Sequence, residues 1–339
     1  MNHGKIHRKK SKTNFNKSII MAVYTKLTQE DIAEFLINYD IGNLNSFKGI
    51  VDGIDNSNYI IQTSKDKYIL TVFEQRMSQQ NLPFFMDLKS FLFQKGVNCP
   101  QPITDKNGKN IGLIKGKKCS IISFLNGQML RSNHEGYYEK ITLKHCSEIG
   151  REVAKLHQIA PKFSQTRKNE LNIKGMEEVS INFSSQLEML GIKEEIALYF
   201  EIIKNIKTEE LSSAVVHGDI FPDNVFFDEK QNLAGIIDFY FASNDFLIYD
   251  LAVVINAWCF DGKNIFDPEK KKILLTEYEK VRKIPKVEQE LLSTMYLKAA
   301  LRFFLTRLKD YFNTPSDSLV KVKNPKEYLE KLRFFASII

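Results

Sequence analysis

The feature that most constrains this chain is a stretch in its second half that places three oxygen-bearing side chains around a predicted hairpin. Asp219 follows a short apolar run and precedes Asn224 by five residues. The next residues predict two short strands, 225–227 and 234–237, and the second ends at Asp238. Because a hairpin returns the chain to its starting end, the three side chains are expected to meet at its mouth.

This spacing is typical of phosphoryl transfer. In kinases, a catalytic-loop Asp stands five residues before an Asn, and an Asp after the next hairpin completes the metal site. Magnesium prefers hard oxygen ligands, and the acceptor hydroxyl needs a carboxylate that orients it and takes its proton. We therefore assign Asp219 as the base, and Asn224 and Asp238 as magnesium ligands. Taken singly, each residue is explained equally well by an Asx turn or a cap, so the prediction depends on their combination.

The charge of the chain argues against a nucleic-acid-binding body. The net charge is +7 over 339 residues, but residues 1–20 hold six of the 48 basic residues and no acid, which leaves 42 basic against 41 acidic residues. An almost neutral body does not offer a basic surface to nucleic acid. Residues 1–20 are predicted to be a disordered basic leader, with the folded part beginning near Met21.

Two further absences narrow the class of protein. The sequence has no run of about 18 apolar residues, so no membrane span is expected. The four cysteines are scattered without a C-x-x-C pair, which favours neither a zinc site nor a disulfide framework and fits a reducing cytoplasm.

The first part of the chain is predicted to be rich in strands. Thr28 resembles a helix N-cap, because an acid follows three residues later. Three strands are predicted next, at 47–51, 59–62 and 68–73, and a helix at 82–94.

Two segments of this region are candidates for nucleotide binding. The loop that ends in Asn56, Ser57 and Asn58 can cover phosphates with backbone N–H groups, although a plain hairpin turn explains it as well. The predicted strand at 119–125 contains Ser123 and Leu125, and Asn126-Gly127 breaks it. In a kinase-like architecture this segment is the hinge whose backbone meets the adenine.

The second part of the chain is predicted to be mainly helical. A hairpin with its turn at Asn107-Gly108 precedes it, and residues 162–182 are expected to be irregular. Helices are predicted at 146–156, 187–206, 249–258, 270–281, 287–312 and 327–335. The fold class is therefore α+β, bilobal, with a sheet-rich lobe at 21–126 and a mainly helical lobe at 127–339.

With these residues in view, the sequence resembles the aminoglycoside-phosphotransferase-like kinases, which have a bilobal protein-kinase-like fold, and within them most narrowly the homoserine kinases. The resemblance covers nearly the whole chain from Met21. Its most specific runs are Phe-Pro-Asp-Asn-Val-Phe-Phe at 221–227, Asp-Phe-Tyr-Phe-Ala at 238–242 and Asn-Ala-Trp-Cys-Phe at 256–260. It implies a cytoplasmic enzyme that uses ATP and Mg²⁺ to phosphorylate the hydroxyl of L-homoserine, giving O-phospho-L-homoserine, a precursor of threonine.

The resemblance also implies the same roles for Asp219, Asn224 and Asp238, but the chain departs from the wider kinase pattern at two other points. In such kinases a lysine of the third strand binds the nucleotide phosphates and forms an ion pair with a glutamate of the facing helix. This chain has Thr71 at the strand position and Phe85 in the facing helix. Tyr240 stands where protein kinases have the Gly of Asp-Phe-Gly. No phosphate-clamping lysine can be named from the sequence.

Homoserine is a zwitterion, so its site requires a cation and an acid. Arg302 and Arg307 can supply a bidentate fork for the carboxylate, and Asp245 and Asp250 can meet the ammonium group. Surface or helix-packing ion pairs explain these four residues at least equally well.

Two alternatives to homoserine phosphorylation stay open. One is a kinase of the same fold for another hydroxyl, such as that of choline, an aminosugar or an aminoglycoside, which an acidic substrate cleft would favour. The other is a non-catalytic nucleotide-binding protein, which the missing lysine favours and the intact Asp219, Asn224 and Asp238 oppose.

Overall fold

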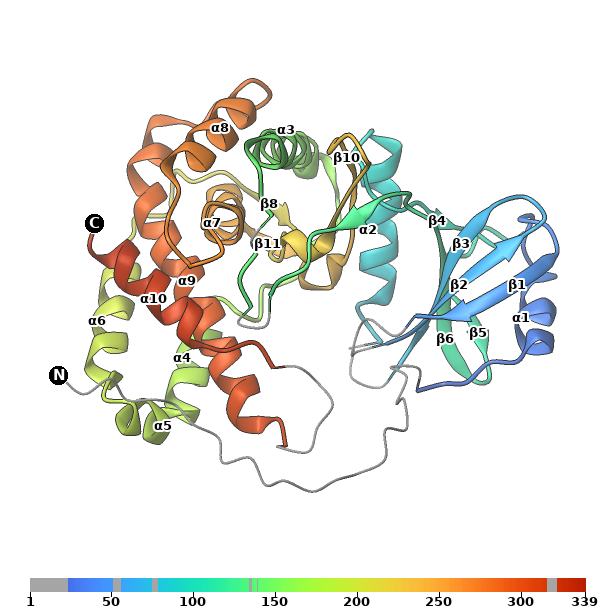
Figure 1. Ribbon diagram of the computed structural model, residues 1–339, viewed down its shortest axis with the longest axis horizontal. Helices are drawn as coiled ribbons and strands as arrows, with labels where there is room; N and C mark the ends of the chain where they lie inside the picture. The colour runs from blue at the N-terminus through green and yellow to red at the C-terminus, as the bar shows by residue number, and fades with distance from the viewer. Residues whose placement is uncertain (1–23, 51–55, 75–78, 134–135, 139, 316–321) are drawn as a thin grey trace.

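The computed structural model describes residues 24–50, 56–74, 79–133, 136–138, 140–315 and 322–339. Figure 1 shows a sheet-rich lobe at one end of the molecule, a mainly helical lobe at the other, and helix α2 between them. The predicted leader at 1–20 and residues 51–55 of the predicted phosphate-covering loop lie outside the described residues.

The sheet of the first lobe is antiparallel, and its described strands follow the order β1-β2-β3-β6-β4, with β5 paired to β6. These strands are β1 (Leu44–Gly49), β2 (Asn56–Thr63), β3 (Lys67–Phe73), β4 (Pro102–Ile103), β5 (Gly112–Ile114) and β6 (Lys117–Ser123). The two helices of this lobe are α1 (Gln29–Leu36) and α2 (Leu82–Gln94).

Helix α1 covers one face of this sheet. Thr28 and Asp31 form a capping box, as the sequence predicts, because each side chain bonds the other's backbone N–H. The helix buries Ile32, Phe35 and Leu36 against a cluster that includes Tyr59 and Leu70. The opposite face of β2 and β3 is thus left for the nucleotide-binding function that the sequence predicts for it.

The hairpin expected around Asn107-Gly108 is placed differently. Strands β5 and β6 are joined at Lys115 and Gly116, which both have positive φ, 49° and 73°. Such a pair matches the twist of a two-residue hairpin. Asn107-Gly108 instead belongs to an Asx turn, in which the Asp105 carboxylate accepts the backbone N–H groups of Asn107 and Lys109.

The second lobe contains two small sheets among helices. Strand β8 (Ser213–Val216) pairs with β11 (Ser243–Phe246), and β10 (Leu233–Ile236) pairs with β9 (Val225–Phe227), which also pairs with β7 (Gln128–Met129). The helices are α3 (Leu143–Ile159), α4 (Ile173–Asn182), α5 (Ser184–Met189), α6 (Lys193–Lys204), α7 (Leu247–Trp258), α8 (Pro268–Glu279), α9 (Lys286–Asn313) and α10 (Lys326–Ala336). Short 3-10 turns are η1 (Ala160–Lys162), η2 (Pro222–Asn224) and η3 (Phe239–Phe241).

Two predictions for this lobe are wrong. Residues 162–182 include α4, which begins where the Asn172 side chain accepts the backbone N–H of Gly175, but which buries only Met176 and therefore has a weak apolar pattern. The single helix predicted at 187–206 is divided into α5 and α6, because Gly191 adopts a left-handed conformation between them.

Helix α7 is the centre of the second lobe. Every one of its residues is buried, from Leu247 to Trp258, and it packs along α9. Its rigid position matters for the site, because the catalytic loop that follows β8 lies against its first turn. Among the described residues, no helix is long and apolar enough to cross a membrane.

Candidate active site

The loop after β8 presents Asp219 at the edge of a cavity. Gly218 has a φ of 77°, which turns the chain so that Asp219 points away from the buried strand. The Asp219 side chain keeps 19% of its surface exposed, and its Oδ1 lies 3.6 Å from Nη1 of Arg302. Its Oδ2 accepts the side-chain N–H of Asn224 at 3.2 Å. A carboxylate that is half-enclosed yet reachable can take part in chemistry.

Asp250, in the first turn of α7, fixes this loop by accepting hydrogen bonds from its backbone. Its Oδ1 accepts the backbone N–H of Gly218 at 2.7 Å, and its Oδ2 accepts that of His217 at 3.0 Å and the His157 ring at 3.1 Å. Burial alone would raise the pKa of Asp250, but the hydrogen bond from His157 and the nearby histidine rings hold it below the ordinary value. Asp250 is therefore a buried anchor of the catalytic loop.

The prediction that Asp250 meets a substrate ammonium group is accordingly wrong. Its side chain is completely buried, and both oxygens are occupied by the protein itself. The sequence carries no signal for this, because an Asp in the first turn of a helix is equally typical of a solvated residue.

His217 connects the loop to the end of the β9–β10 hairpin. Its Nδ1 accepts the backbone N–H of Asp219 at 3.2 Å, and its Nε2 donates to the Ile237 carbonyl at 2.9 Å. Burial lowers the pKa of His217, so the neutral ring suits one donated and one accepted hydrogen bond. The catalytic loop and the residue before Asp238 are thus held in one network.

Asn224 and Asp238 stand on either side of the hairpin base. The backbone N–H of Ile237 donates to the Asn224 carbonyl at 2.9 Å, which brings the two candidate ligands into neighbouring positions. Asp238 has φ 64° and ψ 61°, a left-handed conformation that costs a residue with a Cβ on the order of 1–3 kcal/mol. Such strain is concentrated at functional sites because the surrounding structure must maintain it.

The donor set at this base fits a hard divalent cation. The side-chain nitrogen of Asn224 donates to the Asp219 carbonyl and to Asp219 Oδ2, which leaves the amide oxygen for a cation. Within the described parts of the chain, no group of three or more His, Cys, Asp or Glu residues is placed to hold a metal. Two protein oxygens suit magnesium, which usually keeps waters and phosphate oxygens as its other ligands.

The predicted nucleotide residues of β2 face in two directions. The Ser57 hydroxyl is buried, donates to Glu74 at 2.7 Å and accepts the backbone N–H of Thr25, so this side chain faces the protein interior and is not placed to contact phosphates. Asn56 accepts the backbone N–H of Glu74. Asn58 lies on the other face of the strand, where its Oδ1 accepts the Thr71 hydroxyl at 2.8 Å.

The two predicted hinge residues, Ser123 and Leu125, make different kinds of contact. The Ser123 backbone N–H donates to the Gln101 carbonyl at 2.8 Å, and its Oγ accepts the Gln101 N–H at 2.9 Å, so this amide is not available to an adenine. Leu125 packs over Gly235 of β10 so closely that a Cβ at Gly235 would overlap its methyl groups. Leu125 and Gly235 therefore form an apolar contact between the hinge and the hairpin.

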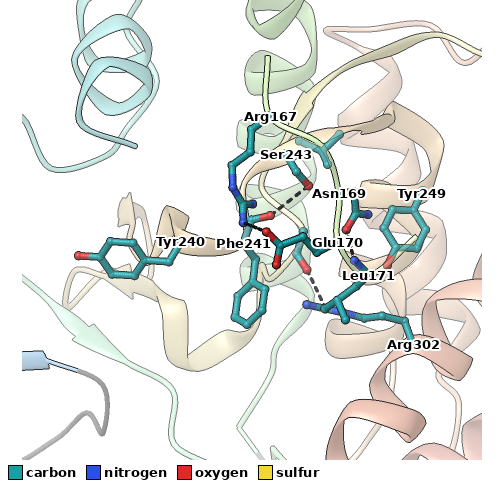
Figure 2. A pocket seen from close by; sticks show the side chains of 11 residues that line it. Arg167, Asn169, Glu170, Leu171, Tyr240, Phe241, Ser243, Tyr249 and Arg302 are labelled. Carbon is teal, nitrogen blue, oxygen red and sulfur yellow. Dashed lines mark hydrogen bonds and ion pairs between the residues drawn. The ribbon is translucent and has the colours of Figure 1, made fainter. Parts of the chain in front are cut away.

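A polar cavity of about 100 Å³ is lined by Gly218, the residue before Asp219, and by Arg302, which lies beside the Asp219 carboxylate. Figure 2 shows its side chains, with Arg167 and Arg302 entering from different segments. The lining residues are Arg167, Asn169, Glu170, Leu171, Val216, Gly218, Tyr240, Phe241, Ser243, Tyr249 and Arg302. Two cations and one carboxylate thus surround a space of the size of a small metabolite.

Arg302 is held in this cavity by the catalytic loop. Its Nη1 donates to the Gly218 carbonyl at 2.9 Å, and its guanidinium lies 3.9 Å from the Phe303 ring centroid and 5.0 Å from that of Phe241. Its place beside a substrate stays a prediction. A guanidinium fixed by stacking keeps its remaining N–H groups in a set direction.

Arg167, Asn169 and Glu170 are site residues that the sequence does not reveal. Arg167 donates to the Ala242 carbonyl at 3.0 Å, lies 3.6 Å from Glu170, and its buried Nε has no partner among the described residues. These residues come from a polar segment predicted to be irregular, where charges are ordinarily solvated. Only the fold brings that segment beside β11, where Lys168 bridges to Asn244.

The two other predicted substrate residues have different surroundings. Asp245 does not line the cavity itself but contacts Asn169, which does: its Oδ2 accepts the Asn169 side-chain N–H at 2.6 Å, and its Oδ1 lies 3.5 Å from Lys298. Arg307 is buried in an ion pair with Glu327 and stacks on Tyr328, so its predicted contact with a substrate carboxylate is wrong. Arg302 and Arg307 lie five positions apart on α9, and therefore on different sides of the helix.

The bilobal fold, with Asp219, Asn224 and Asp238 at the base of one hairpin, is that of a kinase-type phosphotransferase. Residues 46–284 match the model of the phosphotransferase enzyme family, and the chain belongs to this family. Within it, the sequence is similar to curated homoserine kinases. It is 41% identical to that of Sinorhizobium fredii over 321 residues, which cover 94% of this chain and 96% of the relative. It is also 41% identical to that of Agrobacterium fabrum, over 94% of this chain and 97% of the relative.

Solved structures show the same fold at low sequence identity. An amicoumacin kinase in complex with AMP-PNP, Ca²⁺ and its ligand has a TM-score of 0.64 at 14% identity, covering 91% of this chain and 92% of its own. An ethanolamine kinase of Plasmodium vivax has a TM-score of 0.62 at 14% identity, covering 87% and 84%. These likenesses support the bilobal architecture that the sequence predicts.

Proposed function

We propose that this protein is an ATP-dependent homoserine kinase, which transfers the γ-phosphoryl group of ATP to the side-chain hydroxyl of L-homoserine. The observation that carries the proposal is the identity of 41% with curated homoserine kinases over 94% of the chain. The products are ADP and O-phospho-L-homoserine, which also makes the acceptor a small molecule rather than a macromolecule.

In this proposal Asp219 orients the acceptor hydroxyl and takes its proton. The bond that forms joins the homoserine oxygen to phosphorus, the bond that breaks joins phosphorus to the ADP oxygen, and the proton passes to the Asp219 carboxylate. Asn224 donates to Oδ2 of Asp219 and Arg302 lies beside Oδ1, so the carboxylate has a fixed direction before the substrate enters. Pre-set orientation is the main catalytic contribution that a protein can make to phosphoryl transfer.

Asn224 and Asp238 are proposed to hold magnesium through their side-chain oxygens. When bound, magnesium neutralises the charge that develops on the transferred phosphoryl group. The hairpin base fixes both ligands, because the Ile237 N–H joins their backbones and the His217 ring joins Ile237 to the catalytic loop. We propose that the nucleotide is bordered by Asn56, Asn58 and the hinge around Ser123 and Leu125. The Leu125 side chain contacts the adenine ring.

The cavity beside Asp219 is proposed to bind the amino-acid end of homoserine. Arg302 and Arg167 supply positive charge for the carboxylate, and Glu170 and Asp245 supply negative charge for the ammonium group. The orphaned Nε of Arg167 gives a donor that the protein itself does not satisfy. Buried polar groups without a partner are rare, and an entering carboxylate would satisfy this one.

The charge of the cavity also separates this proposal from the alternative acceptors. Choline and aminoglycosides are cationic and require an acidic cleft, whereas this cavity is lined by two arginines and one glutamate. A non-catalytic role does not account for a reachable Asp219 positioned by Asn224, Arg302 and His217.

An acceptor panel tests the proposal. Purified protein is assayed for ADP formation with L-homoserine, D-homoserine, L-serine, choline, glucosamine and kanamycin, and products are identified by mass spectrometry. We expect kcat/KM to be highest for L-homoserine, by at least tenfold over the cationic acceptors, with a product heavier by one phosphoryl group. A higher kcat/KM for choline or kanamycin would replace the proposed acceptor, and ADP formation from none of them would leave homoserine without support.

A further inference from the structure

The middle of the third strand, at Thr71, offers no cation to the nucleotide phosphates, and the strand's lysine, Lys67, stands at its exposed start. Thr71 occupies the position where related kinases carry a lysine, and it is neutral, nearly buried and bonded to Asn58. Transfer of a highly charged phosphoryl group nonetheless calls for positive charge at the phosphates. The departure seen in the sequence therefore persists in the structure and leaves a role to be filled.

Lys89, in the middle of α2, is a buried lysine that is only 5% exposed. Among the residues that the structure describes, the contact seen for its amine is with the ring of Tyr240, and the nearest carboxylate that acts on its charge is Asp238. Burial lowers the pKa of Lys89 to about 8, a shift that nearby Cys99 and Asp238 oppose. Taking an ammonium group out of water is destabilising, so packing alone does not explain why lysine stands there.

The surroundings of Lys89 direct its amine toward the metal-binding end of the hairpin. Its Nζ lies 5.7 Å from the Tyr240 ring centroid, two residues after Asp238. Tyr240 is fixed on α2 and β3 by edge contacts with Phe85, at 5.5 Å, and with Phe73, at 6.3 Å. In Figure 2 the Tyr240 side chain points away from Arg167 and Arg302.

Helix α2 is also well placed to act on both lobes. It lies between the sheet and the helical lobe in Figure 1, and its residues pack on η3 directly after Asp238. Its contact with the second lobe continues through Arg167, whose guanidinium lies 5.2 Å from the Phe85 ring. A charge on this helix is thereby held in a constant position relative to Asp238.

We propose that Lys89 supplies the positive charge that the third strand lacks: its ammonium group binds the nucleotide phosphates beside Asp238. The site would thus receive its lysine from α2, the helix that in related kinases carries the acid, and not from the strand. The inference rests on the nucleotide site of the proposed function but not on homoserine as the acceptor. It gives the buried ammonium an anionic partner, which arrives with the nucleotide.

Nucleotide binding without an acceptor tests this role. Lys89→Met keeps the length and the apolar stem of the side chain and removes its charge, and Lys95→Met removes an exposed lysine from the end of the same helix as a control. Isothermal titration calorimetry with ADP plus magnesium, ATP plus magnesium, and adenosine is combined with melting curves of the ligand-free proteins.

We expect Lys89→Met to weaken both phosphate-bearing ligands roughly ten- to a hundredfold, as for the loss of a charge-assisted contact, and to leave adenosine binding within about twofold. The melting temperature should stay the same or rise, because a desolvated charge has been removed. Lys89→Arg, which keeps the charge, should recover part of the affinity, and Lys95→Met should match the wild type. The same pattern is expected of Lys89→Gln should Lys89→Met not fold.

Two results would overturn the inference. Unchanged affinity for ATP and ADP in Lys89→Met would show that the amine does not reach the phosphates. Equal weakening of adenosine and ATP together with a lower melting temperature would show that the side chain only packs α2 against the hairpin. A wild-type protein that binds neither nucleotide would contradict the proposed function itself, an outcome distinct from either of these.

Discussion

Replacing Asp250 by asparagine should disable the enzyme by loosening the catalytic loop, although Asp250 touches no substrate. The carboxylate accepts two backbone N–H groups, at 2.7 and 3.0 Å, and the His157 ring at 3.1 Å. Asparagine has the same shape, but it offers one acceptor oxygen and turns an N–H₂ group toward donors. At least one buried N–H then loses its partner.

The size of the effect follows from these contacts. A hydrogen bond to a charged group contributes about 1.5–3 kcal/mol, and removing one partner of a buried charged group costs about 3–5 kcal/mol in total. For a chain of this length such a loss lowers the melting temperature by roughly 4–7 °C. Because Gly218 and His217 flank Asp219 in the loop, we expect kcat to fall at least tenfold in the folded protein, with KM for the acceptor changed less.

Calorimetry and steady-state kinetics on the same preparations measure both effects. Glu288→Gln is the matched control, since Glu288 is an equally buried carboxylate that bonds to Arg282 and to the backbone N–H of Ser212 before β8, and not to residues 217–219. It should lower the melting temperature but leave kcat near the wild-type value. If Asp250→Asn raised KM for the acceptor and left kcat and melting temperature unchanged, Asp250 would bind substrate after all and our anchor argument would be refuted.

The pH dependence of stability gives an independent check on Asp250. Its pKa is lower in the folded protein than the ordinary value, so the native state binds its proton less readily than the unfolded chain does. The stability that it contributes is therefore complete above the unfolded pKa of about 4 and is lost as the pH falls below that value. Melting curves between pH 3 and pH 7 should converge for the wild type and Asp250→Asn at the acidic end.

The remaining predictions concern the metal ligands and the two arginines of α9. Asp238→Ala should abolish magnesium-dependent turnover, whereas Asn224→Ala should raise the magnesium concentration needed for half-maximal rate at least severalfold, because an amide oxygen binds a hard dication less strongly than a carboxylate. A magnesium titration of both variants, together with their melting curves, checks these predictions. Variants that melt early but need no additional magnesium would contradict the assignment. Arg302→Met should raise KM for homoserine about tenfold or more with a small change in melting temperature. Arg307→Met should instead lower the melting temperature and change KM for homoserine little, since it breaks the buried ion pair with Glu327. Equal effects on KM from the two variants would show that the cavity has been assigned incorrectly.

The sequence predicts those parts of the fold that local patterns determine. The capping box at Thr28 and Asp31 marks the start of α1, and the apolar stripe with a first-turn proline gives α2 at residues 82–94. The hairpin between Asn224 and Asp238 is predicted from two short apolar runs around a turn. In each case the signal lies within a few residues of the structure that it specifies.

The parts that the sequence does not predict depend on contacts between distant segments. Asp250 reads as an ordinary first-turn acid, and its role appears only when α7 is packed beneath the loop that follows β8. Ser57 is one residue from Asn58, yet the alternation of a strand sends the two side chains to opposite faces. Arg167 comes from a segment without periodicity, and a tertiary bridge to β11 brings it to the cavity.

The central claim is that Asp219 directs transfer of a phosphoryl group to the homoserine hydroxyl, and ³¹P NMR of the complete reaction tests it most directly. With ATP, magnesium and L-homoserine, the wild type should produce a phosphate monoester resonance in equal amount to ADP. Asp219→Asn should bind ADP as the wild type does and form the monoester about 10²–10⁴ times more slowly, the range of a lost general base. Inorganic phosphate in place of the monoester, or an Asp219→Asn variant that keeps more than about a tenth of the wild-type rate, would contradict the account.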